Sequence, residues 1–186
     1  MLKKFAIVTA LVIGIIITAL PALAQEGLSC DPTVDYMKLG WTQKQAGEAE
    51  AALRSFNCGI ELETDDVRLA RLYYGRGAIL CAQGKPDQAL ENYELAIDAD
   101  PEYAMAWNNR GWASYLLGNY DVAMESLEKA LELDPQNAYA YNNRGLVYLK
   151  WGQAEQAMAD FQQAIDLGMA QPWAEINIAN SAYMID

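Results

Sequence analysis

Residues 107–111 read Trp-Asn-Asn-Arg-Gly, and residues 141–145, which lie 34 positions later, read Tyr-Asn-Asn-Arg-Gly. Each stretch begins an apolar run that a second glycine interrupts, Gly118 in the first copy and Gly152 in the next. The pair Arg76-Gly77 occupies the same place one period earlier. Three copies at one fixed spacing indicate an internal repeat that governs the fold of the whole chain.

Within each copy, a glycine lies in the first apolar run, and the second run carries alanines around one large apolar residue. Because residues three and four apart share a helix face, each copy is predicted to form two helices whose apolar stripes meet. We expect the glycines to lie where the two backbones come closest, opposite a small alanine, with the large residue filling the wider part of the seam. The glycines are Gly77, Gly111 and Gly145, the alanines Ala89, Ala123 and Ala157, and the large residues Tyr93, Leu127 and Phe161.

This period, with its order of aromatic, glycine, alanine, large apolar residue, alanine and proline, resembles the tetratricopeptide repeat. The resemblance implies an all-α fold, an α-solenoid in which helix pairs stack into a right-handed superhelix. On this pattern, we expect four helix pairs followed by a C-terminal capping helix. The repeats are residues 33–69, 70–103, 104–137 and 138–171, and the capping helix is 172–184.

The first of the four repeats has diverged, although Tyr36 and Gly40 still fall on its aromatic and glycine positions. Residues 63–69 replace the usual Asp-Pro turn and carry three extra residues. They form either a longer connection or an early start to the next helix, which Asp65 or Asp66 would cap.

Residues 1–24 have the three parts of a secretory signal peptide, namely a basic start, an apolar middle and small residues up to Ala24. Cleavage there leaves a short segment, 25–32, before the repeat domain, 33–186. The protein is then exported, to the periplasm or outside the cell. The alternative is that residues 5–24 stay as a membrane anchor, since an apolar stretch of this length nearly spans a bilayer. Only in that case do we expect a membrane partner.

The chain is acidic, with a formal net charge of −12. Lys3 and Lys4 belong to the leader, so the remainder has 11 basic and 25 acidic residues and a net charge of −14. Nucleic acids and anionic lipids require a basic binding surface, so neither is expected as a partner.

Three cysteines follow the leader, and an exported protein is expected to pair two of them. Cys30 precedes the predicted helix from Asp35, and Cys58 lies near the end of its antiparallel partner. These ends are neighbours, so Cys30 and Cys58 are predicted to form a disulfide. Cys81 lies in the middle of a helix and is predicted to be a small buried thiol.

Nothing in the sequence favours catalysis. The chain has no histidine, no CxxC pair of cysteines and no glycine-rich phosphate loop after a strand. The Asp-Pro pairs and Asp65-Asp66 are explained by turn and cap chemistry. We therefore expect no catalytic residue, no metal and no cofactor, and a protein that is not an enzyme.

The resemblance instead implies a protein–protein interaction module, because the first helix of each pair lines the concave groove in this family. We therefore predict that a peptide or partner protein binds there. The predicted groove residues are Trp41, Arg71, Tyr74, Met105, Asn108, Asn109, Trp112, Tyr115, Tyr139, Asn142 and Asn143. For Trp41 and Trp112, packing within the array is the alternative to ligand binding.

Asn109 and Asn143 fall where some family members present an asparagine ladder to a peptide backbone, although the ladder breaks at Gly75 and Lys38. We expect these amides to lie outside the packing stripe and to bind the ligand backbone. The family's carboxylate clamp is not expected, because Met37 stands where a polar residue would be needed. The predicted ligand has apolar side chains and is not an acidic tail alone.

Arg76, Arg110 and Arg144 stand where the family usually has leucine, directly before the glycine. They either form a charged row for an acidic ligand or pack between repeats and pair with a carboxylate such as Asp100 or Asp134. A second possible function also remains open. In it, the protein is a structural or assembly subunit of an envelope complex, and uses its convex face or the ends of the stack.

Overall fold

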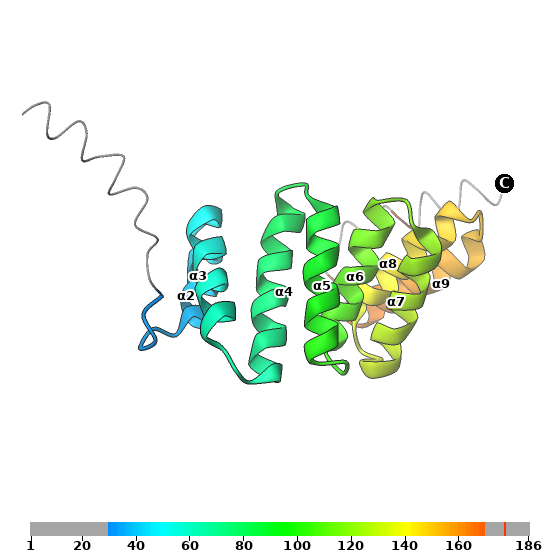
Figure 1. Cartoon of the computed structure of the whole chain (residues 1–186). Helices are drawn as coiled ribbons and strands as arrows, with labels where there is room; N and C mark the ends of the chain where they lie inside the picture. Colours follow the sequence, from blue (N-terminus) through cyan, green and yellow to red (C-terminus); the bar gives the residue numbers. More distant parts are fainter. Residues whose placement is uncertain (1–29, 170–176, 178–186) are drawn as a thin grey trace, which may run out of the picture. The chain divides into compact units, whose positions relative to one another are not determined.

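A computed structural model describes residues 30–169 and residue 177. Within these residues the regular structure consists of eight helices and contains no strand (Figure 1). The helices are α2 (Tyr36–Gln45), α3 (Ala49–Leu62), α4 (Asp66–Ala82), α5 (Pro86–Ala99), α6 (Ala104–Leu116), α7 (Tyr120–Leu133), α8 (Ala138–Lys150) and α9 (Ala154–Asp166). The fold is an all-α solenoid, as the repeat pattern predicts.

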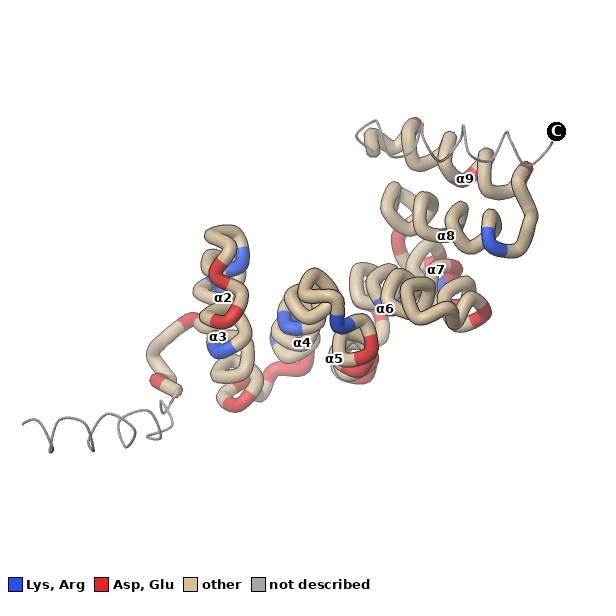
Figure 2. Tube along the Cα trace, turned by 90° about the horizontal axis from the view of Figure 1, so that it is seen from above, with Lys and Arg blue, Asp and Glu red and all other residues tan. Residues whose placement is uncertain are grey.

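The helices pack in chain order. Each first helix packs on its second helix, and each second helix also contacts the first helix of the next pair. Figure 2 shows α4 beside α5 in the view from above. The first helices α2, α4, α6 and α8 also contact one another in turn, whereas the second helices of the described part do not. The first helices therefore line the inner side of the row, which is the concave side.

A glycine in the left-handed backbone region lies in the turn that joins the two helices of each pair. Gly84, Gly118 and Gly152 have φ angles of +74°, +80° and +72°. A side chain is strained in this region, so glycine is the residue that ends the first helix most readily. The period of 34 residues seen in the sequence is therefore also the period of this turn.

The glycines within the first helices make room for the large residue of the second helix. A Cβ atom at Gly77, Gly111 or Gly145 would lie 2.8 Å from Tyr93, 2.7 Å from Leu127 and 2.6 Å from Phe161, respectively. The nearest neighbour of each glycine is therefore the large residue and not the alanine that was expected, although a Cβ atom at Gly111 would also lie 3.2 Å from the backbone oxygen of Ala123. The seam is closest at the large side chain, because that side chain fills the space the glycine leaves.

The first helix pair has the same seam, since a Cβ atom at Gly40 would lie 2.9 Å from the ring of Phe56. The three extra residues after it lengthen the next helix, because α4 already begins at Asp66. Asp65 caps that helix by accepting a hydrogen bond from the backbone N–H of Arg68 at 2.8 Å. Of the two possibilities for residues 63–69, the early helix start is the one observed.

Cys30 and Cys58 are disulfide-bonded, and Cys81 is a free thiol. Cys81 packs against the core that contains Tyr93, and burial raises the pKa of its thiol. A raised pKa keeps the sulfur protonated at neutral pH, so this thiol is a poor nucleophile.

Two predicted segments lie outside the described residues. These are the leader, residues 1–24, and the capping helix, residues 172–184, apart from Asn177, which is helical. Among the helices that the structure does describe, none is long and apolar enough to cross a bilayer.

Candidate functional site

The inner face of the array carries a cavity of about 790 Å³. Its lining comes from α4, α6 and α8, from the α7–α8 connection and from the segment after α9. The lining residues are Tyr74, Met105, Asn108, Asn109, Trp112, Asp134, Gln136, Asn137, Ala138, Tyr139, Asn143, Leu167, Gly168 and Met169. The volume lies within the roughly 300 to 1,000 Å³ typical of ligand pockets.

Seven of the predicted groove residues line this cavity, namely Tyr74, Met105, Asn108, Asn109, Trp112, Tyr139 and Asn143. Two of them are unusually exposed for their size, since Tyr139 is 70% exposed and Met105 is 49% exposed. They occupy the same position in successive repeats, at the start of α8 and α6. The cavity therefore has an apolar wall that the described part of the chain leaves exposed.

The other four predicted groove residues do not line the cavity. Trp41 packs against the core, with its ring centroid 5.5 Å from that of Phe56. For Trp41, the structure therefore shows packing within the array, which was the alternative to ligand binding. Tyr115 stacks on Trp112 with ring centroids 5.4 Å apart. Arg71 is exposed on α4. The remaining residue is Asn142, which belongs to a chain of amides described next.

The asparagines along the inner face are hydrogen-bonded to one another. Asn177 donates from Nδ2 to Oδ1 of Asn142 at 3.0 Å, and the equivalent bond one repeat earlier joins Asn143 to Asn108 at 3.1 Å. Asparagines that are adjacent in the sequence are also bonded, since Asn142 donates to Asn143 at 3.5 Å and Asn108 donates to Asn109 at 2.9 Å. The side chains thus form one directional chain that crosses from repeat to repeat.

This amide chain ends at buried tyrosines. Asn109 hydrogen-bonds with the hydroxyls of Tyr74 and Tyr93, and these bonds partly oppose the rise in pKa that burial imposes on both phenols. Asn109 and Asn143 were expected to lie outside the packing stripe, yet both are half-buried, and Asn143 donates to the buried Asn108 of the preceding repeat. These amides therefore link neighbouring repeats, in addition to any contact that they make with a ligand.

Sequence reasoning missed half of the cavity lining. Asp134 was interpreted as part of a turn or as an arginine partner, Gln136 and Asn137 were given no role, and the segment 167–169 carries no binding motif. Asn137 does act as a helix cap, accepting from the backbone N–H of Ala140 at 3.1 Å. The α7–α8 connection therefore both forms the turn and lines the cavity. Its place in the cavity wall becomes apparent only when the next helix pair is packed against it.

The arginines before the glycines do not form a charged row in the cavity, since none of the three lines it. Each donates to a residue 16 positions later, on the second helix of its own repeat. Arg76 bonds Asn92 at 2.6 Å, Arg110 bonds Ser126 at 2.6 Å, and Arg144 bonds Asp160 twice, at 2.7 and 2.8 Å. Packing is therefore the correct alternative, although the partners are not Asp100 and Asp134.

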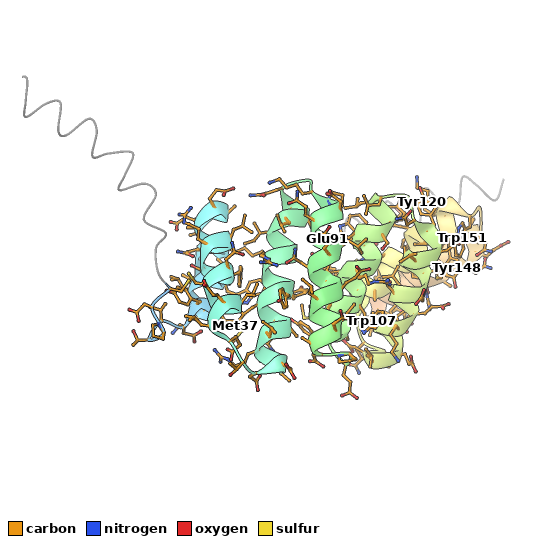
Figure 3. The ribbon with its side chains drawn as sticks, in the orientation of Figure 1. Met37, Glu91, Trp107, Tyr120, Tyr148 and Trp151 are labelled. Carbon is orange, nitrogen blue, oxygen red and sulfur yellow. The ribbon has the colours of Figure 1, made fainter. Side chains whose placement is uncertain are left out.

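Each of these guanidinium groups also lies over the aromatic ring three residues earlier. The ring partners are Tyr73 at 5.4 Å, Trp107 at 5.8 Å and Tyr141 at 5.4 Å. Trp107 lies toward the lower ends of the helices in Figure 3. The aromatic ring and the hydrogen-bond partner on the second helix hold each arginine in place, so its aliphatic stem packs in the seam between the two helices.

No group of three or more cysteine, aspartate or glutamate side chains suited to hold a metal ion occurs in the described ranges. The cavity lining consists mainly of amides, aromatic rings and methionines, with one carboxylate, that of Asp134. Such a lining can bind a ligand through apolar contact and hydrogen bonds.

Comparison with known proteins identifies the repeat. The profile of the tetratricopeptide repeat matches residues 74–138, and a second profile of the same name matches residues 126–159. A structure of Pseudomonas aeruginosa pilF is similar, with 26% identity and a TM-score of 0.70 over 80% of this chain and 66% of that one. Residues 74–159 therefore carry repeats of the tetratricopeptide family, whose fold supports a protein–protein interaction module and whose members are typically non-enzymatic scaffolds.

Two other similarities are more limited. The first tetratricopeptide domain of RPAP3, bound to the HSP90 peptide SRMEEVD, has a TM-score of 0.61 at 24% identity, over 64% of this chain and 94% of that one. The Mus musculus protein O-mannosyl-transferase TMTC1 is 34% identical over 61 residues, which are 32% of this chain and 6% of that protein. So short a match does not bring the activity of a transferase to this chain.

Proposed function

We propose that this protein binds a segment of a partner protein in the cavity on its inner face. The observation that carries the proposal is the apolar wall formed by Tyr139 and Met105, which the fold leaves exposed in a concave surface. Burying such side chains against a partner removes apolar surface from water and stabilises the complex. The neighbouring Trp112 extends this wall.

The amides of the cavity supply polar contacts of the right kind for a peptide backbone. An asparagine side chain can donate two hydrogen bonds and accept two. Asn108 and Asn143 can therefore bond each other and still contact a peptide group. The RPAP3 domain, which has the same fold, holds a short peptide, and this supports the use of such an array for peptide binding.

The substitution Tyr139→Ala tests the proposal most directly. We expect it to weaken partner binding by about 1 to 3 kcal/mol, as for an aromatic anchor, and to leave thermal stability unchanged, because the ring is mostly exposed. Trp112→Ala is a poorer choice, because Trp112 also stacks on Tyr115. The measurement is capture from a cell-envelope extract, followed by titration of the captured partner with wild-type and variant protein.

Trp151→Ala is the matched control. Trp151 is 40% exposed and lies with Tyr120 toward the upper ends of the helices in Figure 3, where the two line a separate hollow of about 330 Å³. Loss of the partner with Tyr139→Ala but not with Trp151→Ala supports the cavity. Equal capture by all three proteins supports the alternative, a structural or assembly subunit that uses its outer face or the ends of the stack.

We also propose that the protein acts in the cell envelope or outside the cell. The signal-peptide pattern of residues 1–24 supports this location, and so does the disulfide bonding of Cys30 and Cys58, since structural disulfides persist in oxidising compartments. Sequencing the N-terminus of the protein isolated from cells should give Gln25 as the first residue. Recovery of the intact leader in a membrane fraction would favour the anchored form through residues 5–24.

A further inference from the structure

Among the described residues that line the cavity, Asp134 is the one that carries a charge. It ends α7, and its Oδ1 accepts a hydrogen bond from the backbone N–H of Gln136 at 3.1 Å. This bond holds the carboxylate in the α7–α8 connection, which lines the same cavity as Tyr139 at the start of α8. The single charge therefore has a fixed place in the cavity wall.

Nothing in the described part of the cavity neutralises this carboxylate. No lysine or arginine lines the cavity, and none of the ion pairs in the described ranges includes Asp134. Arg110 and Arg144, on the same helices as the lining, are bonded to residues of the second helices. The cavity therefore presents a negative charge on a protein whose net charge is already −12.

We propose that the cavity selects an apolar segment that carries one basic side chain, with the basic group placed against Asp134. This inference rests on the proposed function and names the chemistry of the partner. A lysine or arginine gains an attractive interaction in a cavity that excludes part of the water, whereas a glutamate or a terminal carboxylate is repelled. Met105, Met169 and Tyr139 contact the apolar residues of the segment.

The peptide held by the RPAP3 domain, SRMEEVD, has the opposite net charge, because its one arginine is outweighed by three acidic side chains and the terminal carboxylate. We therefore expect that peptide not to bind here. The two arrays share a fold, and here the negative charge of the cavity lining disfavours so acidic a segment.

The experiment selects peptides from a random library displayed on phage, using the full-length protein as bait. Display through the peptide's C-terminal end leaves no free carboxylate. We expect the selected peptides to share apolar residues and one lysine or arginine at a fixed position. A synthetic consensus peptide with an amidated C-terminus should bind Asp134→Asn about tenfold more weakly than wild type, since a bond to a charged group is lost. Asparagine keeps the acceptor for the N–H of Gln136.

Asp100→Asn is the matched control. Asp100 occupies the same turn position one repeat earlier and accepts from the backbone N–H of Glu102 at 3.1 Å, but it does not line the cavity. Its substitution should leave affinity unchanged. A consensus peptide in which the basic residue is replaced by norleucine should bind wild type and Asp134→Asn equally well.

The outcomes separate the two proposals. If the selected peptides lose affinity for Tyr139→Ala but contain no basic residue, or bind Asp134→Asn as tightly as wild type, the inference is overturned and the proposed function stands. If SRMEEVD binds as tightly as the consensus peptide, the inference is likewise overturned. If no peptide is selected, or if the selected peptides bind Tyr139→Ala as well as wild type, both proposals are wrong.

Discussion

Replacing Phe161 by alanine is expected to lower the free energy of unfolding by about 3 to 5 kcal/mol, the usual cost of deleting a buried phenylalanine ring. Phe161 is 0% exposed, and its ring fills the space that Gly145 leaves open. Because glycine has no side chain to move into the vacated volume, the site cannot collapse and a cavity remains. Urea unfolding followed by far-ultraviolet circular dichroism measures the change.

Gln162→Ala, on the exposed side of the same helix, is the control for Phe161→Ala and should change stability by less than about 0.5 kcal/mol. Helix pairs in a solenoid contact only their neighbours, so faster hydrogen exchange should be concentrated in α8 and α9. A loss below about 1 kcal/mol for Phe161→Ala would show that α8 and α9 do not pack through this ring.

The second large effect is expected at Asn108, whose replacement by alanine should cost about 2 to 4 kcal/mol of unfolding free energy. Asn108 is 7% exposed and accepts from Asn143 while donating to Asn109. Its removal leaves a donor of Asn143 and an acceptor of Asn109 without their partner, and each unsatisfied buried group costs roughly 1 to 3 kcal/mol. The same urea experiment measures this loss.

Asn119→Ala is the control for Asn108→Ala, because Asn119 is exposed and its side chain makes no capping hydrogen bond. A double-mutant cycle between Asn108 and Asn143 should give a coupling energy of about 0.5 to 3 kcal/mol if the two repeats are joined through these amides. An Asn108→Ala protein as stable as wild type would indicate that the amides bond water instead. They would then be ligand contacts of the kind that the sequence predicts.

The repeat pattern predicted the helices well, because it records local requirements. Gly118 and Gly152 mark turns whose backbone only glycine adopts without strain, and the apolar spacing between them has the helical period. The pattern also predicted seven residues of the cavity, because a fixed register places equivalent residues on one face. It did not predict that Gly145 would face Phe161 instead of Ala157, since that depends on the relative rotation of two helices.

The candidate site was less predictable at its polar residues. Asn109 and Asn143 were assigned to a ligand, because register places them on the inner face but does not reveal that Asn108 lies between them. The arginine partners Ser126 and Asp160 were missed for the same reason, since the choice among nearby acceptors depends on distances across the seam.

The sequence by itself determined the helix pairs, the turns and the inward face of each first helix, because backbone strain and hydrophobic period act within one repeat. Only the tertiary structure decided what lies on that face. It brought Asp134 and the segment 167–169 to the cavity, packed Trp41 against the core, and joined the asparagines into a chain. These outcomes depend on how successive repeats are rotated and spaced, which is set by packing among residues far apart in the sequence.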